Sequence, residues 1–137
     1  MAVEGMVFLV VFASAGIGYF YAQKRARQSM SQRFADRDPL GIEQVCDLFC
    51  IEPYADRLMI KELLDHVAAE LDVNPEVLRP SDRFEVELKP VKGWGFDSGV
   101  TTLMLELDRL AKEKNLSIDL SSVKTLADYV EWMLKVY

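Results

Sequence analysis

Residues 99–115 read Gly-Val-Thr-Thr-Leu-Met-Leu-Glu-Leu-Asp-Arg-Leu-Ala-Lys-Glu-Lys-Asn. Apolar side chains recur here every three or four residues, which places them on one face of a helix. They are Val100, Leu103, Met104, Leu107, Leu110 and Ala111. The pattern predicts an amphipathic helix that packs on a core. We expect Asp97 or Ser98 to cap its start and Asn115 to end it.

The same spacing predicts further helices towards the N-terminus. The longest runs from about residue 53 to residue 71, with an apolar stripe of Ile60, Leu63, Leu64, Val67 and Leu71 that is widened by Leu58 and Ala68. A short amphipathic stretch covers residues 42–51. Asn74 and Pro75 are typical of the cap and first residue of a very short helix at 76–78.

A last helix is predicted to begin after Ser121 or Ser122, either of which suits the capping position, and to run through Leu134. Its expected inner face is Leu126, Val130, Met133 and Leu134, with Tyr129 and Trp132 flanking. Residues 84–88 alternate apolar and acidic side chains, but this stretch is too short and isolated to make a sheet. We therefore expect an all-α fold, with a small helical bundle in the C-terminal part.

The N-terminal segment has a different composition. From Gly5 to Gln23 no side chain is charged, and these 19 residues would span about 28 Å as a helix. Lys24, Arg25 and Arg27 follow directly. The pattern predicts one transmembrane helix with the N-terminus outside and the rest of the chain in the cytoplasm.

The alternatives to this anchor are a cleaved signal peptide and a buried core helix. A cleaved signal peptide would have basic residues before the apolar run, although residues 13–15, Ala-Ser-Ala, are typical of a cleavage site. A buried core helix is rarely apolar on all faces in so short a chain. The expected organisation is an anchor at 1–23, a basic juxtamembrane linker at 24–41 and a helical domain at 42–137.

Charge is divided between these parts. Residues 1–37 carry a net charge of +3 and residues 38–137 a net charge of −9, which together give the −6 of the chain. The basic arm suits anionic lipid headgroups. The acidic domain argues against nucleic acid as a partner, because phosphates would be repelled. It suits a protein partner with a basic surface, or simply solubility.

The order of segments across residues 57–134 resembles the acyl carrier proteins. The resemblance is carried by the turn at 71–82 (Leu-Asp-Val-Asn-Pro-Glu-Val-Leu-Arg-Pro-Ser-Asp), by residues 84–88, by the pair Asp97-Ser98 before an apolar-striped helix, and by Thr125-Leu126 leading into residues 130–133. It implies a four-helix bundle. It also implies that Ser98 is the serine esterified by 4′-phosphopantetheine, with Asp97 as the aspartate of the motif.

The chain departs from that family at three points. Eight residues separate Leu88 from Asp97. Members of the family that the chain resembles usually have about two residues at this place. Gly99 stands where an apolar residue is expected, and the first acid of the following helix is Glu106. The alternative interpretation of Ser98 is an ordinary N-cap.

The inserted loop contains Trp94 and Phe96, framed by Gly93 and Gly95. These two aromatic residues could anchor a partner peptide or fold back onto the bundle.

Catalytic and metal-binding patterns are absent from the sequence. His66 is the only histidine, and its neighbour Asp65 does not share its helix face. Cys46 and Cys50 are predicted to be buried thiols rather than a disulfide or metal pair. The chain is therefore not expected to be an enzyme. We expect an acyl-carrier-like module that presents an acyl group or a docking surface at the membrane. An unmodified interaction or scaffold module, or a small subunit of a membrane complex, is the alternative.

Overall fold

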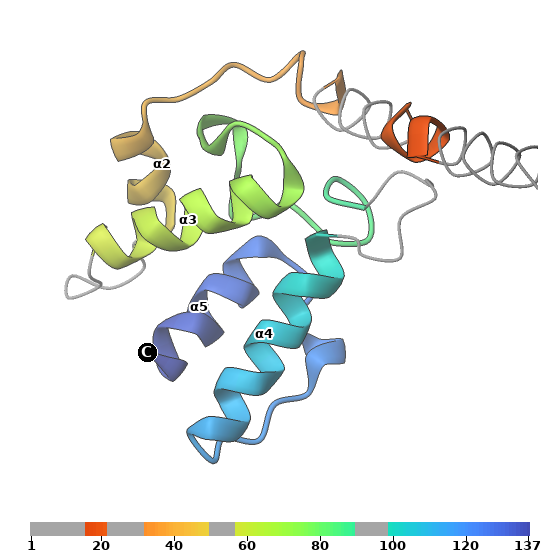
Figure 1. Ribbon diagram of the computed structural model, residues 1–137. Coiled ribbons are helices and arrows are strands. Elements are labelled where there is room, and N and C mark those ends of the chain that lie inside the picture. Colours follow the sequence, from red (N-terminus) through yellow and green to blue (C-terminus); the bar gives the residue numbers. More distant parts are fainter. Residues whose placement is uncertain (1–15, 22–31, 50–56, 90–98) are drawn as a thin grey trace, which may run out of the picture.

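The computed structural model describes residues 16–21, 32–49, 57–89 and 99–137. Its helices are α2 (Ile42–Phe49), α3 (Arg57–Leu71), α4 (Gly99–Glu113) and α5 (Leu126–Val136), with two short 3-10 helices, η1 (Pro75–Val77) and η2 (Leu120–Ser122). One isolated antiparallel bridge joins Arg83 to Thr125, and these ranges contain no strand. The prediction of an all-helical fold is confirmed for the described part of the chain (Figure 1).

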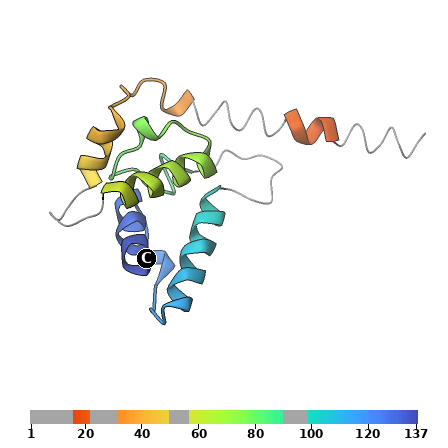
Figure 2. The same ribbon diagram turned by 60° about the vertical axis from the view of Figure 1, so that its left-hand side comes forward.

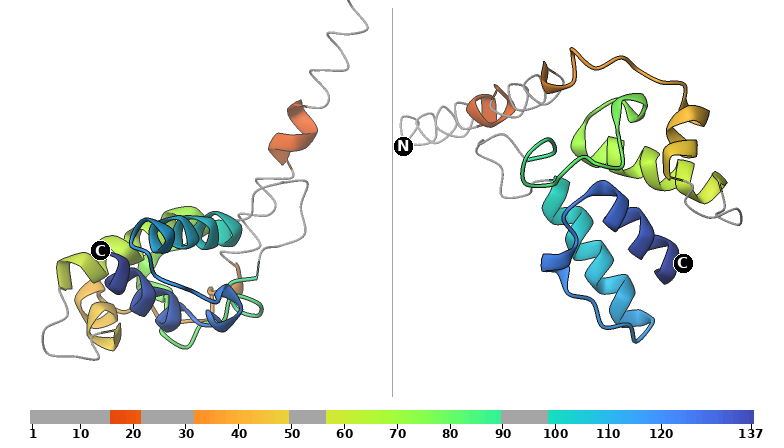
Figure 3. Two further views of the ribbon diagram at one scale, coloured as in Figure 1. Left: turned by 90° about the horizontal axis from the view of Figure 1, so that it is seen from below. Right: turned by 180° about the vertical axis from the view of Figure 1, so that it is seen from behind.

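Helix α3 lies at the centre of the arrangement. It contacts α2, η1, α4 and α5. Helices α4 and α5 contact each other and lie on one side of α3, whereas α2 and the turn after α3 lie elsewhere around it (Figures 2 and 3). The N-terminal end of α4 meets the C-terminal end of α3 (Figure 1).

The core is built from the apolar stripes of these helices. Side chains with no exposed surface include Ile60, Leu64, Val67, Leu103, Leu107, Leu126, Tyr129 and Met133. Burial of one such aliphatic side chain contributes about 1.5–3 kcal/mol to folding. The predicted stripes therefore form one continuous core, although Leu58 is 63% exposed and does not belong to it.

Helices α3 and α4 end in the same way. Asp72 and Asn115 follow the last turns with φ of 54° and 55°. After α3, the N–H of Val73 donates to the carbonyl of Ala68. After α4, the N–H of Leu116 likewise donates to the carbonyl of Ala111. Both ends are Schellman motifs, so the predicted stop at Asn115 is confirmed.

The start of α5 differs from the prediction. Thr125, and neither serine, is the N-cap: its hydroxyl accepts from the N–H of Asp128, whose carboxylate accepts from the N–H of Thr125. Ser121 and Ser122 lie in η2 instead, where Asp119 is the cap. The short helix at 75–77 is confirmed, with Asn74 accepting from the N–H of Glu76.

Residues before α3 also pack on the domain. Helix α2 buries Val45, Cys46 and Phe49, so this stretch belongs to the helical domain. Phe34, in the segment expected to be a linker, is only 5% exposed and joins the core.

Residues 16–21 are helical, and their side chains are exposed. They fall inside the predicted anchor, most of which lies outside the described residues. Within the ranges that the structure describes, no helix combines the length and apolar character needed to cross a membrane.

Candidate functional site at the start of α4

The first residue of α4 touches the backbone of α3. A Cβ atom added at Gly99 would lie 2.8 Å from the carbonyl carbon of Glu70, closer still to its oxygen, and 3.2 Å from Cδ2 of Leu71. Only glycine allows the two helices to approach so closely. Glycine at this position is therefore explained by packing.

The end of α3 is held rigidly at this contact. The Schellman motif at Asp72 fixes the turn, and the N–H of Val73 is bonded to Ala68 at 3.0 Å. Asn74 then begins η1. Gly99, the first residue of α4, thus lies against the backbone of the last turn of α3.

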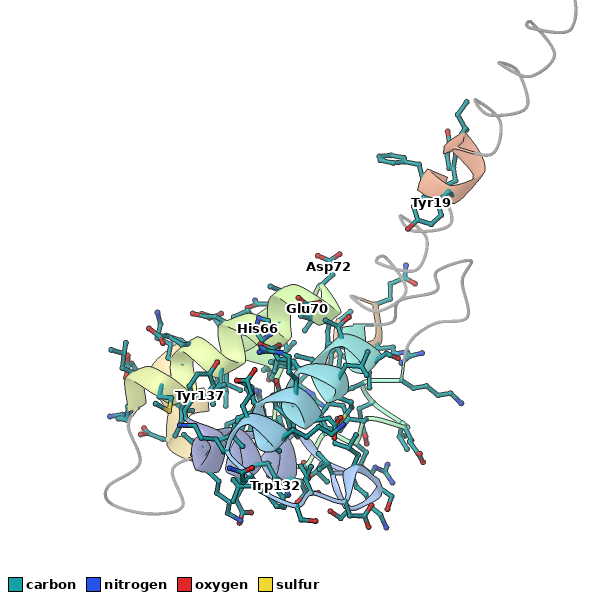
Figure 4. All side chains as sticks on the ribbon, turned by 60° about the horizontal axis from the view of Figure 1, so that its bottom comes forward. Tyr19, His66, Glu70, Asp72, Trp132 and Tyr137 are labelled. Atoms are coloured by element: carbon teal, nitrogen blue, oxygen red, sulfur yellow. The ribbon has the colours of Figure 1, made fainter. Side chains whose placement is uncertain are left out.

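A polar contact joins α3 and α4 partway along their length. His66 Nε2 lies 2.7 Å from Glu106 Oε2. Both side chains are partly exposed, at 38% and 28%. Figure 4 shows His66 and Glu70 on the part of α3 that runs beside α4, with Asp72 at the end of the helix. His66 is thus a cross-helix partner of Glu106, and Asp65 instead pairs with Lys61 on α3 at 3.7 Å.

A buried hydroxyl lies in the core among α3, α4 and α5. Tyr129 has no exposed surface, and no hydrogen-bond partner for its hydroxyl occurs in the described part of the chain. Burial raises the pKa of this hydroxyl, and the charges of Glu106, Tyr137 and Glu70 add to the effect. Its ring packs edge to face on Phe84, with centroids 6.1 Å apart. Tyr129 was expected to flank the inner face of α5, and the structure places it inside the core.

The predicted site residues Asp97, Ser98, Trp94 and Phe96 lie outside the described residues. Ser98 directly precedes the first residue of α4 in the sequence. The first turn of α4 has no acidic side chain, so its own carboxylates do not neutralise the positive end of the helix dipole. The positive end of a helix dipole favours an anion.

Metal binding finds no support in the described ranges, where no group of three or more His, Cys, Asp or Glu side chains is placed to hold an ion. Cys46 is buried, and Cys50 lies outside those ranges.

Sequence reasoning missed two features around this site. The role of Gly99 in helix contact has no local signal, because it depends on the backbone of Glu70, far away in the sequence. The buried carboxylate of Asp82, only 1% exposed, was treated as part of a turn. The pairing of Arg37 with Asp82 leaves no local sequence pattern, because the two residues are far apart in the chain.

Comparisons with models of known families, with curated proteins and with solved structures find no match to this chain. The function is therefore inferred from the residues and their arrangement.

Proposed function

We propose that this chain is a membrane-anchored module of the acyl-carrier type, in which Ser98 carries 4′-phosphopantetheine and presents an acyl group to partners at the membrane. The observation that carries the proposal is the position of Ser98, immediately before α4, a helix without acidic residues in its first turn. A phosphodiester there would face the positive end of the helix dipole. Asp97 would be the aspartate of the motif.

The helix order supports the same proposal. The chain order α3, turn with η1, α4 and α5 is the order that the resemblance to acyl carrier proteins implies. The capped turn at Asn74 and Pro75 and the capping box at Thr125 fall on residues that carry the resemblance. The acidic surface of this domain suits a protein partner with a basic surface, and Trp94 and Phe96 are the proposed anchor residues for it.

The experiment is intact mass spectrometry of the full chain after expression with a broad-specificity phosphopantetheinyl transferase. Modification adds roughly 340 Da to the chain. The gain is expected in the parent chain and in Ser121→Ala, a matched change at an exposed serine, and is absent in Ser98→Ala. An unchanged mass, with a transferase that modifies a known carrier in parallel, rejects the carrier function.

A second candidate, an unmodified interaction module, is favoured by Gly99. Close contact with Glu70 explains this residue without any cofactor. In addition, the family's second helix meets basic enzyme surfaces through acids in its early turns, and α4 has none before Glu106. Unchanged mass together with retained binding of a membrane partner would support this candidate.

The anchor is proposed from the uncharged run between Gly5 and Gln23 and the cations that follow it. The basic arm is proposed to contact anionic lipids, and the helical domain to face the cytoplasm. The test is alkaline extraction followed by protease treatment of sealed vesicles. The domain should stay with the membrane and be digested only from the cytoplasmic face. Release of a chain trimmed near residue 15 would contradict the anchor.

A further inference from the structure

Residues 32–41, here called the strap, lie against the turn after α3. Phe34 is buried in the core at 5% exposure. The guanidinium of Arg37 lies over the Phe34 ring, 4.8 Å from its centroid. The strap therefore has an apolar contact that holds Arg37 in place.

Arg37 contacts both ends of a short stretch of the turn. Its Nη1 donates to the carbonyl of Val77 at 2.7 Å and to Oδ2 of Asp82 at 2.9 Å. The side chain of Asp82 is only 2% exposed. The same carboxylate oxygen accepts from the N–H of Arg79 at 2.8 Å. Since a buried carboxylate needs a partner, Asp82 depends on the strap for its counter-charge.

Further hydrogen bonds join the strap to the turn after α3, with donors on both segments. The N–H of Leu40 donates to the carbonyl of Glu76 at 3.1 Å. Arg79 Nη2 donates to the carbonyl of Asp38 at 2.8 Å. At the other end, Arg33 Nη1 donates to the carbonyls of Glu87 and Lys89.

The strap thus holds residues 76–89, here called the turn segment, at its start, middle and end. The Arg37–Asp82 pair differs from exposed ion pairs such as Arg109–Glu113, which lies within one helix. An isolated pair of that kind has little effect on stability. A buried carboxylate with one guanidinium partner couples the two segments that supply them.

We propose that the strap and the turn segment form one cooperative unit, which opens and closes as a whole, with the Arg37–Asp82 contact coupling its two halves. The turn segment leads directly into residues 90–98, which contain Ser98. Resting on the proposed function, this makes the strap a positioning device for the segment that precedes the modified serine.

The test is hydrogen exchange of the full chain in mild detergent, read by mass spectrometry of peptides. Cooperative units exchange together when they open. In Arg37→Gln, we expect exchange in the strap (residues 32–41) and in the turn segment (residues 76–89) to become at least about tenfold faster by a common factor, while α4 keeps its rate.

Asp82→Asn makes the reciprocal test, because it removes the charge from the turn segment and leaves the strap unchanged. Since coupling is reciprocal, exchange in the strap, residues 32–41, should rise by a similar factor. Arg109→Gln is the matched control, since it removes an exposed Arg–Glu pair and should leave every peptide unchanged. Exchange that rises in only one of the two segments, or equally throughout α3, α4 and α5 in both variants, overturns the proposal. The readout does not depend on modification of Ser98, so an unmodified chain with coupled exchange would reject the proposed function alone.

Discussion

The two sides of α3 are held by different kinds of contact. On the side of α4 and α5, side chains such as Leu103, Leu107 and Met133 have no exposed surface. On the side of the turn segment, Arg37 and Arg79 reach carbonyl and carboxylate oxygens. The first contact is large and non-directional. The second combines buried apolar side chains such as Leu78 and Leu88 with a few specific donors and acceptors.

This difference determines what each side tolerates. A hydrophobic contact loses stability in proportion to the volume removed. It can accommodate, at some cost, a polar group such as the Tyr129 hydroxyl, which has no partner among the described residues. A contact that depends on one buried carboxylate fails when either partner is removed. Substitutions that change side-chain volume should therefore affect stability most on the side of α4 and α5. Substitutions that remove a charge should affect it most in the turn segment.

The largest expected effect is that of Gly99→Ala on the helical side. The added methyl group would meet the backbone of Glu70, and forcing the helices apart should cost about 1–3 kcal/mol of unfolding free energy. Gly41→Ala is the matched control, because nothing lies within 4 Å of a Cβ added there, and its cost should stay within about 0.5 kcal/mol. Urea unfolding followed by circular dichroism measures both. Equal stability of the two variants would show that a methyl group at residue 99 does not disturb the packing of α4 on α3.

Tyr129→Phe should change stability less, and it tests whether the same hydrophobic contact tolerates a buried polar group. The substitution removes a buried hydroxyl that has no partner in the described part of the chain and keeps the ring that packs on Phe84. Because an unsatisfied buried group is unfavourable, the variant should be as stable as the parent or up to about 1 kcal/mol more stable. The urea midpoint at constant slope is the measurement. A clear loss of stability would mean that the hydroxyl makes a favourable interaction.

The smallest expected effect is a pH dependence in the turn segment. Hydrogen bonds from the Arg83 side chain and N–H lower the pKa of Glu87 from its ordinary 4.5 to about 2. Because the folded-state pKa is depressed, the stabilisation is complete above pH 4.5 and is lost as the pH falls towards 2. Carboxyl shifts followed by NMR should give a low midpoint for Glu87, and Arg83→Gln should return it towards 4.5. An identical midpoint in both proteins would contradict the role of Arg83.

The helices could be predicted from sequence because their signals are local. The stripe through Leu103 and Leu107 and the stop at Asn115 both lie within a few residues of the features they determine. The cap at Asn74 before Pro75 is equally local. These elements were therefore placed almost as the structure has them.

The remaining features depend on residues far apart in the sequence. Thr125 was missed as a cap because two serines nearby suit the same position, and the bridge from Arg83 that fixes Thr125 comes from a distant loop. Phe34 was assigned to a polar linker because a single aromatic residue gives no periodic pattern. Of the candidate site, Asp97, Ser98, Trp94 and Phe96 lie outside the described residues, so their roles stay predictions.

The crowding at Gly99 affects how any saturation mutagenesis of this protein should be interpreted. A Cβ at that position meets a main-chain carbonyl, so a screen scored on abundance alone should favour glycine there. Intolerance at this codon would reflect steric exclusion between two helices. It would carry no information about chemistry on the neighbouring serine.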